Sequence, residues 1–389
     1  MNADALGCVR RVADYAQDLV YAVIAWMQCG ASGSKVKVNG ISYEIVRLLG
    51  EGGFSMVYLV RDTQTGQEFA LKKIRCQHGA ESVREALAEV DAMTRFRNPN
   101  VIRLCDSAVL ADTQGASTSL RGNVPVHDEE QGSVERIVYI VLPYYEHGNV
   151  QDAISAHVIR GTRFEERWML QVFCDACLAV HAMHTYALPA VEMDAAKSDG
   201  ASLLFDAVSE LSYFPATPMA TMQQTRADAH IEPYAHRDIK PANIMLGDHG
   251  RTGVLMDFGS TIRARVAIRS RKEAIAHQDL AAERSSMPYR APELFDVKTD
   301  TVLDEKVDIW ALGCTLYAMA YLHSPFETPS TEGGSLALAV TNGAYKFPEQ
   351  DPYSAATRAI IQRCLTTDPA ARPSIEEVIA MTTNALNTL

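Results

Sequence analysis

Residues 49–57 combine three glycines with small and apolar side chains, between two segments of strand-like pattern. A hairpin with so little side-chain bulk can fold its backbone over phosphate groups. An ordinary glycine hairpin fits the same residues about as well. The residues that would line a phosphate cradle here are Leu49, Gly50, Gly52, Gly53, Phe54, Ser55 and Val57.

A lysine and a glutamate follow in an order that fits such a cradle. Lys72 lies on the next strand-like segment, and Glu89 lies on the helix-like segment after it. An ion pair between them would position the lysine on the α- and β-phosphates of a nucleotide. A lone Lys or Glu is usually a solvated surface charge, but their order after the glycine segment favours phosphate binding.

Three motifs in the second half of the chain decide between these interpretations. They are His236-Arg237-Asp238 with Asn243 after it, Asp257-Phe258-Gly259, and Ala291-Pro292-Glu293. With the glycine segment, Lys72 and Glu89, they resemble the eukaryotic protein kinase family in order and spacing. The resemblance covers residues 43 to about 385 and implies a bilobal α+β fold, with a β-rich N-lobe and an α-rich C-lobe.

The resemblance implies transfer of the γ-phosphoryl group of ATP to serine or threonine of protein substrates. Asp238 would accept or orient the proton of the substrate hydroxyl. Asn243 and Asp257 would supply the oxygen ligands that Mg²⁺, or Mn²⁺, requires. Lys240, typical of serine/threonine kinases, would neutralise charge on the transferred group, as Lys72 would at the nonreacting phosphates.

Two further matches concern architecture. Asp308 resembles the residue that tethers the catalytic loop of the family, and Arg372 resembles the partner of Glu293. They support the fold more than the chemistry.

Within the family, the glycine segment departs from the general pattern because Ser55 stands in place of its third glycine, which can lower loop flexibility. Gly-Glu-Gly-Gly-Phe-Ser, residues 50–55, resembles the Numb-associated kinase family. Further segments resemble its small, fatty-acylated, Golgi- and vacuole-associated branch; they are residues 142–145, 255–257, 278–284 and 289–295.

In that branch Leu142 would be the gatekeeper, and Pro143 to Tyr145 would be the hinge that contacts adenine through backbone groups. Ala70 would line the same ATP site.

The activation segment would run over residues 257–293, with a helical insertion over 271–284. Ser285, Ser286 and Tyr289 are candidate phosphorylation sites near the substrate groove. For Ser286 an equally good alternative is that it only hydrogen-bonds the catalytic loop.

Residues 9–28 have apolar side chains at helical spacing and predict an amphipathic helix. Animal members of the branch carry N-myristate, which needs glycine after Met1, whereas this chain has Asn2. Cys8, and Cys29 second, are therefore candidates for palmitoylation, which would hold a cytoplasmic enzyme peripherally on Golgi, endosomal or vacuolar membrane. The alternative, weighed equally, is unmodified cysteines and a helix packed on the kinase domain.

Composition sets bounds on these interpretations. With 389 residues, 47% hydrophobic, the chain is long enough for about two domain-sized units. A net charge of -12 disfavours nucleic acid and gives no general attraction to anionic lipid. Eight scattered cysteines fit a reducing compartment, and the apolar run 19–27 is too short to span a bilayer.

Periodicity predicts a strand-rich first part and a helical second part. The expected strands are residues 43–49, 56–61 and 68–74, and the expected helices are 82–96, 165–184, 307–320, 355–364 and 374–386. We expect three regions: residues 1–40 as helix and linker, 41–142 as N-lobe with an insertion at 111–134, and 143–389 as C-lobe with an insertion at 187–232.

Cys174, Cys177, His181 and His184 have residue types typical of a zinc site. All four fall on one predicted helix, where ten residues span about 15 Å. Four ligands must each lie about 2 Å from a zinc ion, so we expect ordinary packing instead.

Two other hypotheses about the function compete with that of an active kinase. A pseudokinase scaffold on membranes is one, and a nucleotide-binding regulator without turnover is the other. Lys72, Glu89, Asp238, Asn243 and Asp257 are all present, whereas a pseudokinase usually lacks at least one of them, which favours catalysis.

Overall fold

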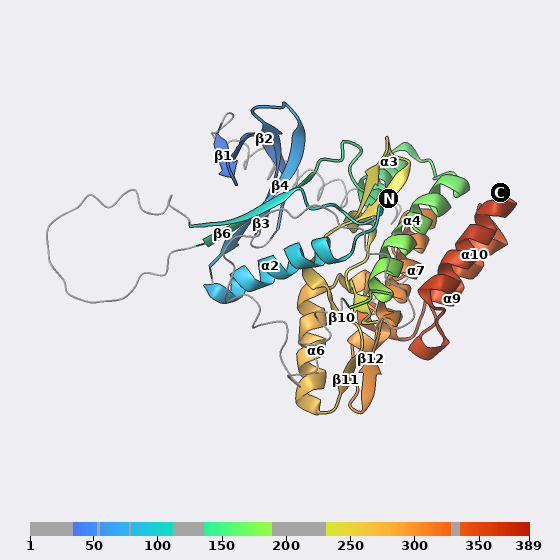
Figure 1. Ribbon diagram of the computed structural model, residues 1–389. Coiled ribbons are helices and arrows are strands. Elements are labelled where there is room, and N and C mark those ends of the chain that lie inside the picture. Colours follow the sequence, from blue (N-terminus) through green and yellow to red (C-terminus); the bar gives the residue numbers. More distant parts are fainter. Residues whose placement is uncertain (1–33, 53–54, 78, 112–135, 189–230, 328–334) are drawn as a thin grey trace, which may run out of the picture. The chain divides into compact units, whose positions relative to one another are not determined.

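The structure is a computed structural model that describes residues 34–52, 55–77, 79–111, 136–188, 231–327 and 335–389 (Figure 1). The predicted helix over 9–28, Cys8, Cys29, Gly53, Phe54 and nearly all of both expected insertions lie outside these residues. By its internal contacts the chain divides into two compact units. The first comprises residues 1–90 and 103–144, and the second comprises residues 91–102 and 145–389.

The first unit is built on a six-stranded antiparallel sheet in the order β1-β2-β3-β4-β6-β5. Its strands are β1 (Lys35–Val38), β2 (Ile41–Glu51), β3 (Ser55–Asp62), β4 (Glu68–Cys76), β5 (Asp106–Ala111) and β6 (Arg136–Pro143). The expected strands over 43–49, 56–61 and 68–74 are confirmed as the central parts of β2, β3 and β4. Side chains from one face form the core, including Val38, Tyr43, Val60, Leu71 and Val141.

Strand β1 was not expected from the sequence, although a signal for it exists. Asn39 and Gly40 join β1 to β2 with φ of 44° and 91°. An Asn-Gly pair accepts positive φ at both central positions of a tight hairpin turn. That dipeptide therefore predicts the hairpin, and Val38, with none of its surface exposed, ties β1 to the core.

The second unit is largely helical. Its helices are α3 (Val150–Arg160), α4 (Glu166–His184), α6 (Arg271–Arg284), α7 (Lys306–Tyr321), α8 (Leu336–Thr341), α9 (Ala355–Cys364) and α10 (Ile375–Thr388), while α2 (Ala80–Arg95) crosses the division between the units. Short strands pair as β7 (Tyr234–Ala235) with β10 (Ile262–Arg263), β8 (Ile244–Gly247) with β9 (Thr252–Leu255), and β11 (Val266–Ile268) with β12 (Thr301–Leu303). Short 3₁₀ helices are η2 (Pro241–Asn243), η3 (Phe258–Ser260), η4 (Met287–Tyr289), η5 (Pro292–Leu294) and η6 (Pro369–Ala371).

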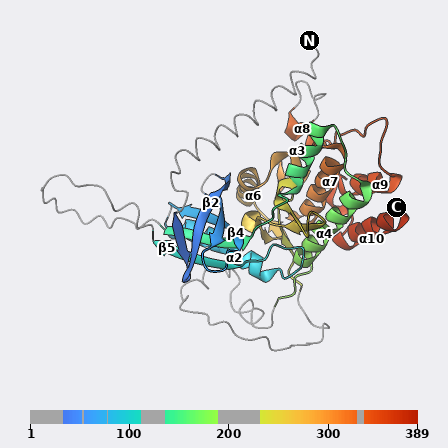
Figure 2. The same cartoon turned by 90° about the horizontal axis from the view of Figure 1, so that it is seen from above.

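Helix α7 forms the centre of this unit. Its residues from Val307 to Ala320 are all buried, and Trp310 stacks on Phe326 with ring centroids 5.6 Å apart. Helices α4 and α9 lie beside it, and α10 packs on α4 and α9 (Figure 2). The predicted helices that fall within the described residues are confirmed to within two residues at each end, including the helix over 271–284, which is α6.

The structure confirms the expected α+β protein kinase fold, an antiparallel sheet followed by a largely helical region. Within the described segments, no helix is both long enough and apolar enough to cross a bilayer.

Candidate active site

Lys72 and Glu89 form a buried ion pair in the first unit. Nζ of Lys72 lies 2.8 Å from each carboxylate oxygen of Glu89. The two side chains are 16% and 7% exposed, so solvent screens their attraction only weakly. Lys72 is fixed by the pairing of β4 with β3 and β6, and Glu89 projects from α2. The predicted ion pair is confirmed.

The glycine segment forms the β2–β3 turn of the same unit. The amide of Gly52 donates to the carbonyl of Ser55 at 2.7 Å, and the reverse bond measures 3.3 Å. A Cβ at Gly52 would meet Oγ of Ser55 at 3.0 Å. Gly52 and Ser55, the described residues on either side of the turn, are therefore joined by two backbone hydrogen bonds.

Other expected nucleotide-binding residues of this unit lie along the sheet. Val57 pairs with Lys72, and Ala70 pairs with Leu142. Leu142 is 5% exposed. Pro143 ends β6, and Tyr145 begins the longer of the two segments of the second unit.

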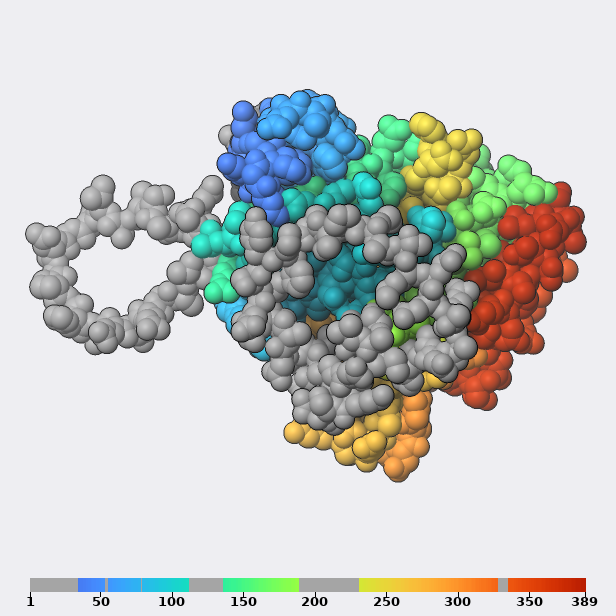
Figure 3. All heavy atoms as spheres, in the orientation of Figure 1, coloured from blue at the N-terminus to red at the C-terminus, as the bar shows by residue number. Residues whose placement is uncertain are grey.

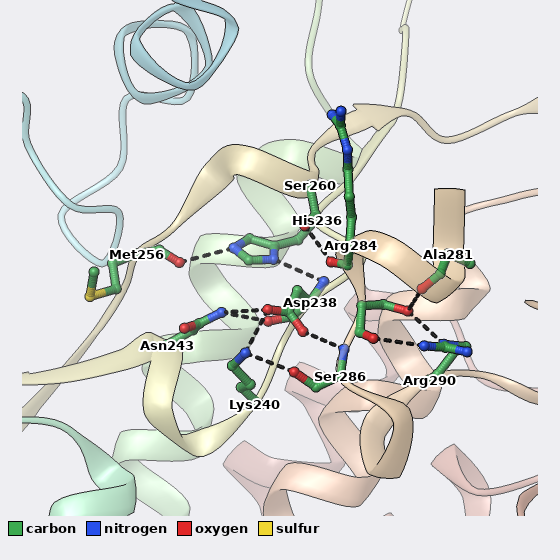
Figure 4. Close-up of polar contacts among 11 residues, drawn as sticks. His236, Asp238, Lys240, Asn243, Met256, Ser260, Ala281, Arg284, Ser286 and Arg290 are labelled. Atoms are coloured by element: carbon green, nitrogen blue, oxygen red, sulfur yellow. Dashed lines mark hydrogen bonds and ion pairs between the residues drawn. The ribbon is translucent and has the colours of Figure 1, made fainter. Parts of the chain in front are cut away.

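Asp238 is held by three hydrogen-bond donors in the second unit (Figure 4). One carboxylate oxygen accepts from the backbone amide of Ser286 at 2.8 Å. The other accepts from Nζ of Lys240 at 2.8 Å and from Nδ2 of Asn243 at 3.2 Å. Asn243 also donates to the main-chain carbonyl of Asp238 at 2.8 Å. These bonds fix both the loop and the orientation of the carboxylate.

His236 connects this loop to the segment before Asp257. The amide of Asp238 donates to Nδ1 of His236 at 3.3 Å, so Nδ1 carries no proton. The proton must then sit on Nε2, which donates to the carbonyl of Met256 at 3.1 Å. The imidazole also packs on Phe258, with ring centroids 5.2 Å apart.

Asp308, on α7, anchors the catalytic loop through hydrogen bonds to its backbone. It is fully buried and accepts from the amides of His236 and Arg237 at 2.8 and 2.9 Å. Nε2 of His184 lies 3.0 Å from the same carboxylate. Burial acts to raise the pKa of Asp308, but the hydrogen bond and charge of His184, with smaller contributions from His236 and Arg237, hold it below its usual value. The tethering role expected for Asp308 is confirmed.

His184 was missed as a positioning residue. Its spacing on α4 with Cys174, Cys177 and His181 drew attention to zinc, whereas its partner Asp308 is far away in sequence. Nothing in the spacing indicates that contact.

Asn243 and Asp257 carry the oxygen atoms that a hard cation requires. The amide of Met256 donates to the main-chain carbonyl of Asn243 at 2.9 Å, which brings the start of the Asp257 motif beside η2. Figure 4 shows the side-chain oxygen of Asn243 pointing away from Asp238. Asp257 has a left-handed backbone, with φ of 66°, which is uncommon for a residue other than glycine. This donor set fits Mg²⁺ or Mn²⁺.

The activation segment contacts the catalytic loop through Ser286. Oγ of Ser286 accepts from Nζ of Lys240 at 2.7 Å. Ser285, which follows α6 as its C-cap, donates to the carbonyl of Ala281 at 2.6 Å and accepts from Nε of Arg290 at 2.8 Å. The hydrogen-bonding alternative for Ser286 is thus present in the structure. Phosphorylation of Ser285, Ser286 or Tyr289 stays a prediction, and burial raises the pKa of the Tyr289 phenol.

The four suspected zinc ligands on α4 do not form a cluster. Cys174 and Cys177 are buried, His181 lies 3.6 Å from Glu376, and His184 contacts Asp308. Among the residues that the structure describes, no group of metal-ligating side chains converges there. The contacts of these four residues are those of ordinary helix packing.

Comparison with known proteins agrees with this geometry. The family model for the protein kinase domain matches residues 43–188 and 218–382. The chain belongs to the protein kinase family.

Several curated relatives match nearly all of this kinase. Serine/threonine-protein kinase ppk13 of Schizosaccharomyces pombe is 35% identical over 89% of this chain and 91% of its own length. Serine/threonine-protein kinase ENV7 of Saccharomyces cerevisiae is 32% identical over 90% and 93%. Serine/threonine-protein kinase 16 of Rattus norvegicus is 31% identical over 90% and 93%. The protein is a serine/threonine protein kinase, with ATP and protein as substrates and a divalent metal as the cofactor that such domains use.

Proposed function

We propose that Asp238 is the residue that orients the substrate hydroxyl and accepts its proton during transfer of the γ-phosphoryl group. The observation that carries this assignment is the hold on its carboxylate by Lys240, Asn243 and the amide of Ser286. A base fixed in one orientation loses no further entropy when the substrate arrives. Proton transfer by such a group contributes typically 10²–10⁴-fold to a rate.

The proposed step forms a bond between the serine or threonine oxygen and the γ-phosphorus, and breaks the bond from that phosphorus to the β–γ bridging oxygen. ADP leaves with the bonding electrons, and the hydroxyl proton passes to Asp238. Lys240, 2.8 Å from Asp238, places its cation where it can stabilise negative charge on the phosphoryl oxygens. Lys72, fixed by Glu89, does the same for the α- and β-phosphates.

Mg²⁺ or Mn²⁺, when bound, would neutralise phosphate charge, and Asn243 and Asp257 are the residues that would hold it. Ala70, Leu142 and Pro143 to Tyr145 would contact the adenine.

Incorporation of labelled phosphate into a generic serine- and threonine-containing protein tests these roles. We expect Asp238→Asn to lower the rate by about 10²–10⁴-fold, while Asp296→Asn, at an exposed position of the same unit, leaves it unchanged. Equal incorporation by Asp238→Asn and wild type contradicts the mechanism. A pseudokinase would incorporate none in wild type either, so the wild-type rate separates the two functions.

We further propose that the kinase belongs to the Numb-associated family and to its small acylated branch. The sequence of residues 50–55 and the helix α6 inside the activation segment support this placement. In this branch the kinase acts in trafficking at Golgi, endosomal or vacuolar membranes.

Palmitate on Cys8 is the proposed membrane anchor. The support is its place before a basic pair, Arg10 and Arg11, at the start of a predicted amphipathic helix. We expect Cys8→Ser to shift the kinase from the membrane fraction and to remove hydroxylamine-sensitive acyl labelling. Cys29→Ser, at the second candidate position, is measured beside it for comparison. Unchanged fractionation and labelling in Cys8→Ser would exclude this anchor without touching the catalytic assignment.

A further inference from the structure

Two turns of the second unit, distant in sequence, are joined by backbone hydrogen bonds. The first is the turn at 145–148, where the amide of Gly148 donates to the carbonyl of Tyr145 at 3.1 Å. The second is the β8–β9 turn at 247–252. The amide of Leu246 donates to the carbonyl of Gly148 at 2.9 Å, and residues 149 and 245 form an antiparallel bridge. The backbones of the two turns therefore have a fixed relation.

The β8–β9 turn is itself tightly constrained. Asp248, His249 and Gly250 all have positive φ, of 44°, 55° and 82°. The carbonyl of Gly250 accepts from the indole nitrogen of Trp168 on α4 at 2.8 Å. A histidine is one of the few residues that adopt positive φ with moderate cost. The position of His249 on the surface is thus set by the backbone around it.

Three metal-ligating side chains converge where the turns meet. Oε1 of Glu146 lies 3.4 Å from Nε2 of His147 and 3.9 Å from Nδ1 of His249. All three ligand atoms lie within 4.8 Å of one another. In the part of the chain that the structure describes, they are the one group of three or more His, Cys, Asp or Glu side chains so arranged.

These separations suit a small tetrahedral ion. Ligand atoms about 2.0–2.1 Å from zinc lie about 3.3 Å apart. The pair formed by Glu146 and His147 already has that spacing, whereas His249 needs to approach Glu146 by about 0.6 Å and His147 by at most about 1.5 Å. The three side chains are 43–78% exposed, so such rotamer adjustments meet little resistance. Figure 3 shows the β8–β9 turn, in yellow, at the surface next to the green segment around α3.

The ligand types select the metal. Two imidazoles and one carboxylate suit zinc, whereas Mg²⁺ and Ca²⁺ take oxygen ligands. The carboxylate of Asp248, in the same turn, adds negative charge, although it is paired with Arg251 at 3.2 Å.

We propose that Glu146, His147 and His249 bind one zinc ion, with water completing its coordination. The ion cross-links the turn at 145–148 to the β8–β9 turn. The site shares no residue with the metal site proposed at Asn243 and Asp257. Its nitrogen ligands also do not suit Mg²⁺, the catalytic metal. Its ligation also requires neutral imidazoles, so proton uptake competes with zinc.

Zinc titration of the purified full-length kinase in excess Mg²⁺ tests this assignment, by calorimetry and by thermal shift. We expect His249→Asn to lower the affinity of one zinc equivalent by more than about 100-fold, since even loss of a residue that only orients a ligand costs 10–100-fold. Asparagine tolerates the backbone at this position, so the turn should survive. Glu146→Gln should weaken the same equivalent.

His181→Asn is the matched control, because His181 is a partly exposed histidine 3.6 Å from Glu376 that belongs to no such group of three among the described residues. We expect it to bind zinc as wild type does. The proposal is overturned if wild type takes up no zinc at micromolar concentration, or if wild type, His249→Asn and Glu146→Gln give the same isotherm. The latter result would place the bound zinc on other ligands, such as the thiols.

Discussion

The guanidinium of Arg372 provides the sharpest quantitative test of how the second unit is held together. Its side chain is fully buried, and Glu293 accepts two parallel bonds from it at 2.7 and 2.8 Å. The remaining donors reach main-chain carbonyls; they are those of Thr366, Thr367 and Lys306. All five N–H groups of the guanidinium are thus satisfied, so the partnership expected from the sequence is confirmed.

Replacing Arg372 with methionine keeps much of the volume but leaves the carboxylate of Glu293 and three carbonyls without these donors. Removal of one partner of a buried ion pair typically costs about 3–5 kcal/mol. For a unit of this size each kcal/mol lowers the melting temperature by about 2–4 °C, so we expect a fall of about 6–20 °C. Arg372→Lys, which keeps the charge but cannot form the parallel bonds, should fall between.

Tryptophan fluorescence during heating and in urea measures this effect, because Trp168 and Trp310 both lie in the second unit. The matched control is Arg265→Met, which removes another two-bond pair, at 2.7 and 3.1 Å to Glu305. Arg265 is 62% exposed, so its loss should cost less than about 1 kcal/mol.

A double-mutant cycle isolates the orphaned carboxylate. In a Glu293→Gln background, Arg372→Met should cost less than it does alone, because no buried charge is left behind. Two results would contradict this explanation: equal falls in melting temperature for Arg372→Met and Arg265→Met, or a double-mutant cycle in which the two effects simply add. Either would show that burial does not determine how much the ion pair stabilises the kinase.

Three further predictions concern single positions. Ser286→Asp places a second carboxylate beside Asp238 and should lower kcat/KM by about 100-fold. Ser286→Ala retains the backbone amide, so its kcat/KM should stay within about tenfold of wild type. Equal effects of the two substitutions would show that the added negative charge is not what lowers the rate. Gly313→Ala puts a Cβ 2.6 Å from that of Cys364, so it should destabilise the kinase by about 1–3 kcal/mol in urea unfolding, and an unchanged midpoint would show that the helices can separate freely. The pKa of Asp308 is lowered in the folded state. Its ionised form therefore stabilises the kinase above about pH 4, and this stabilisation is lost as the pH falls through the lowered pKa. The urea unfolding midpoint of Asp308→Asn should depend less on pH in this range than that of wild type.

Secondary structure was predictable wherever one residue pattern fits one element. Strands β2, β3 and β4 are short runs separated by glycine-containing turns, and α9 has the bounds that its apolar spacing indicates. Helix α7 was also found, although it is buried all round, because its apolar run is too long for a strand. The weakest point was β1, where four residues carry too little periodicity and the Asn-Gly turn was the better signal.

The reacting groups could also be predicted from the sequence, because phosphoryl transfer requires particular residue types, which the kinase motifs carry in a fixed order along the chain. Asp238, Lys240 and Lys72 could be named because the motifs that contain them resemble the protein kinase family in order and spacing. Their hydrogen-bond partners could be named only in part: Glu89 was expected, whereas Ser286 was open and His184 was taken for a packing residue.

The sequence by itself determined the fold class, the order of the elements and the identity of the chemical groups, since these depend on local pattern and on residue type. Only the tertiary structure decided which distant groups meet. It placed His184 on Asp308 and His249 beside Glu146 and His147. The physical reason is that a contact between remote segments is fixed by the packing of whole elements, and no spacing along the chain records it.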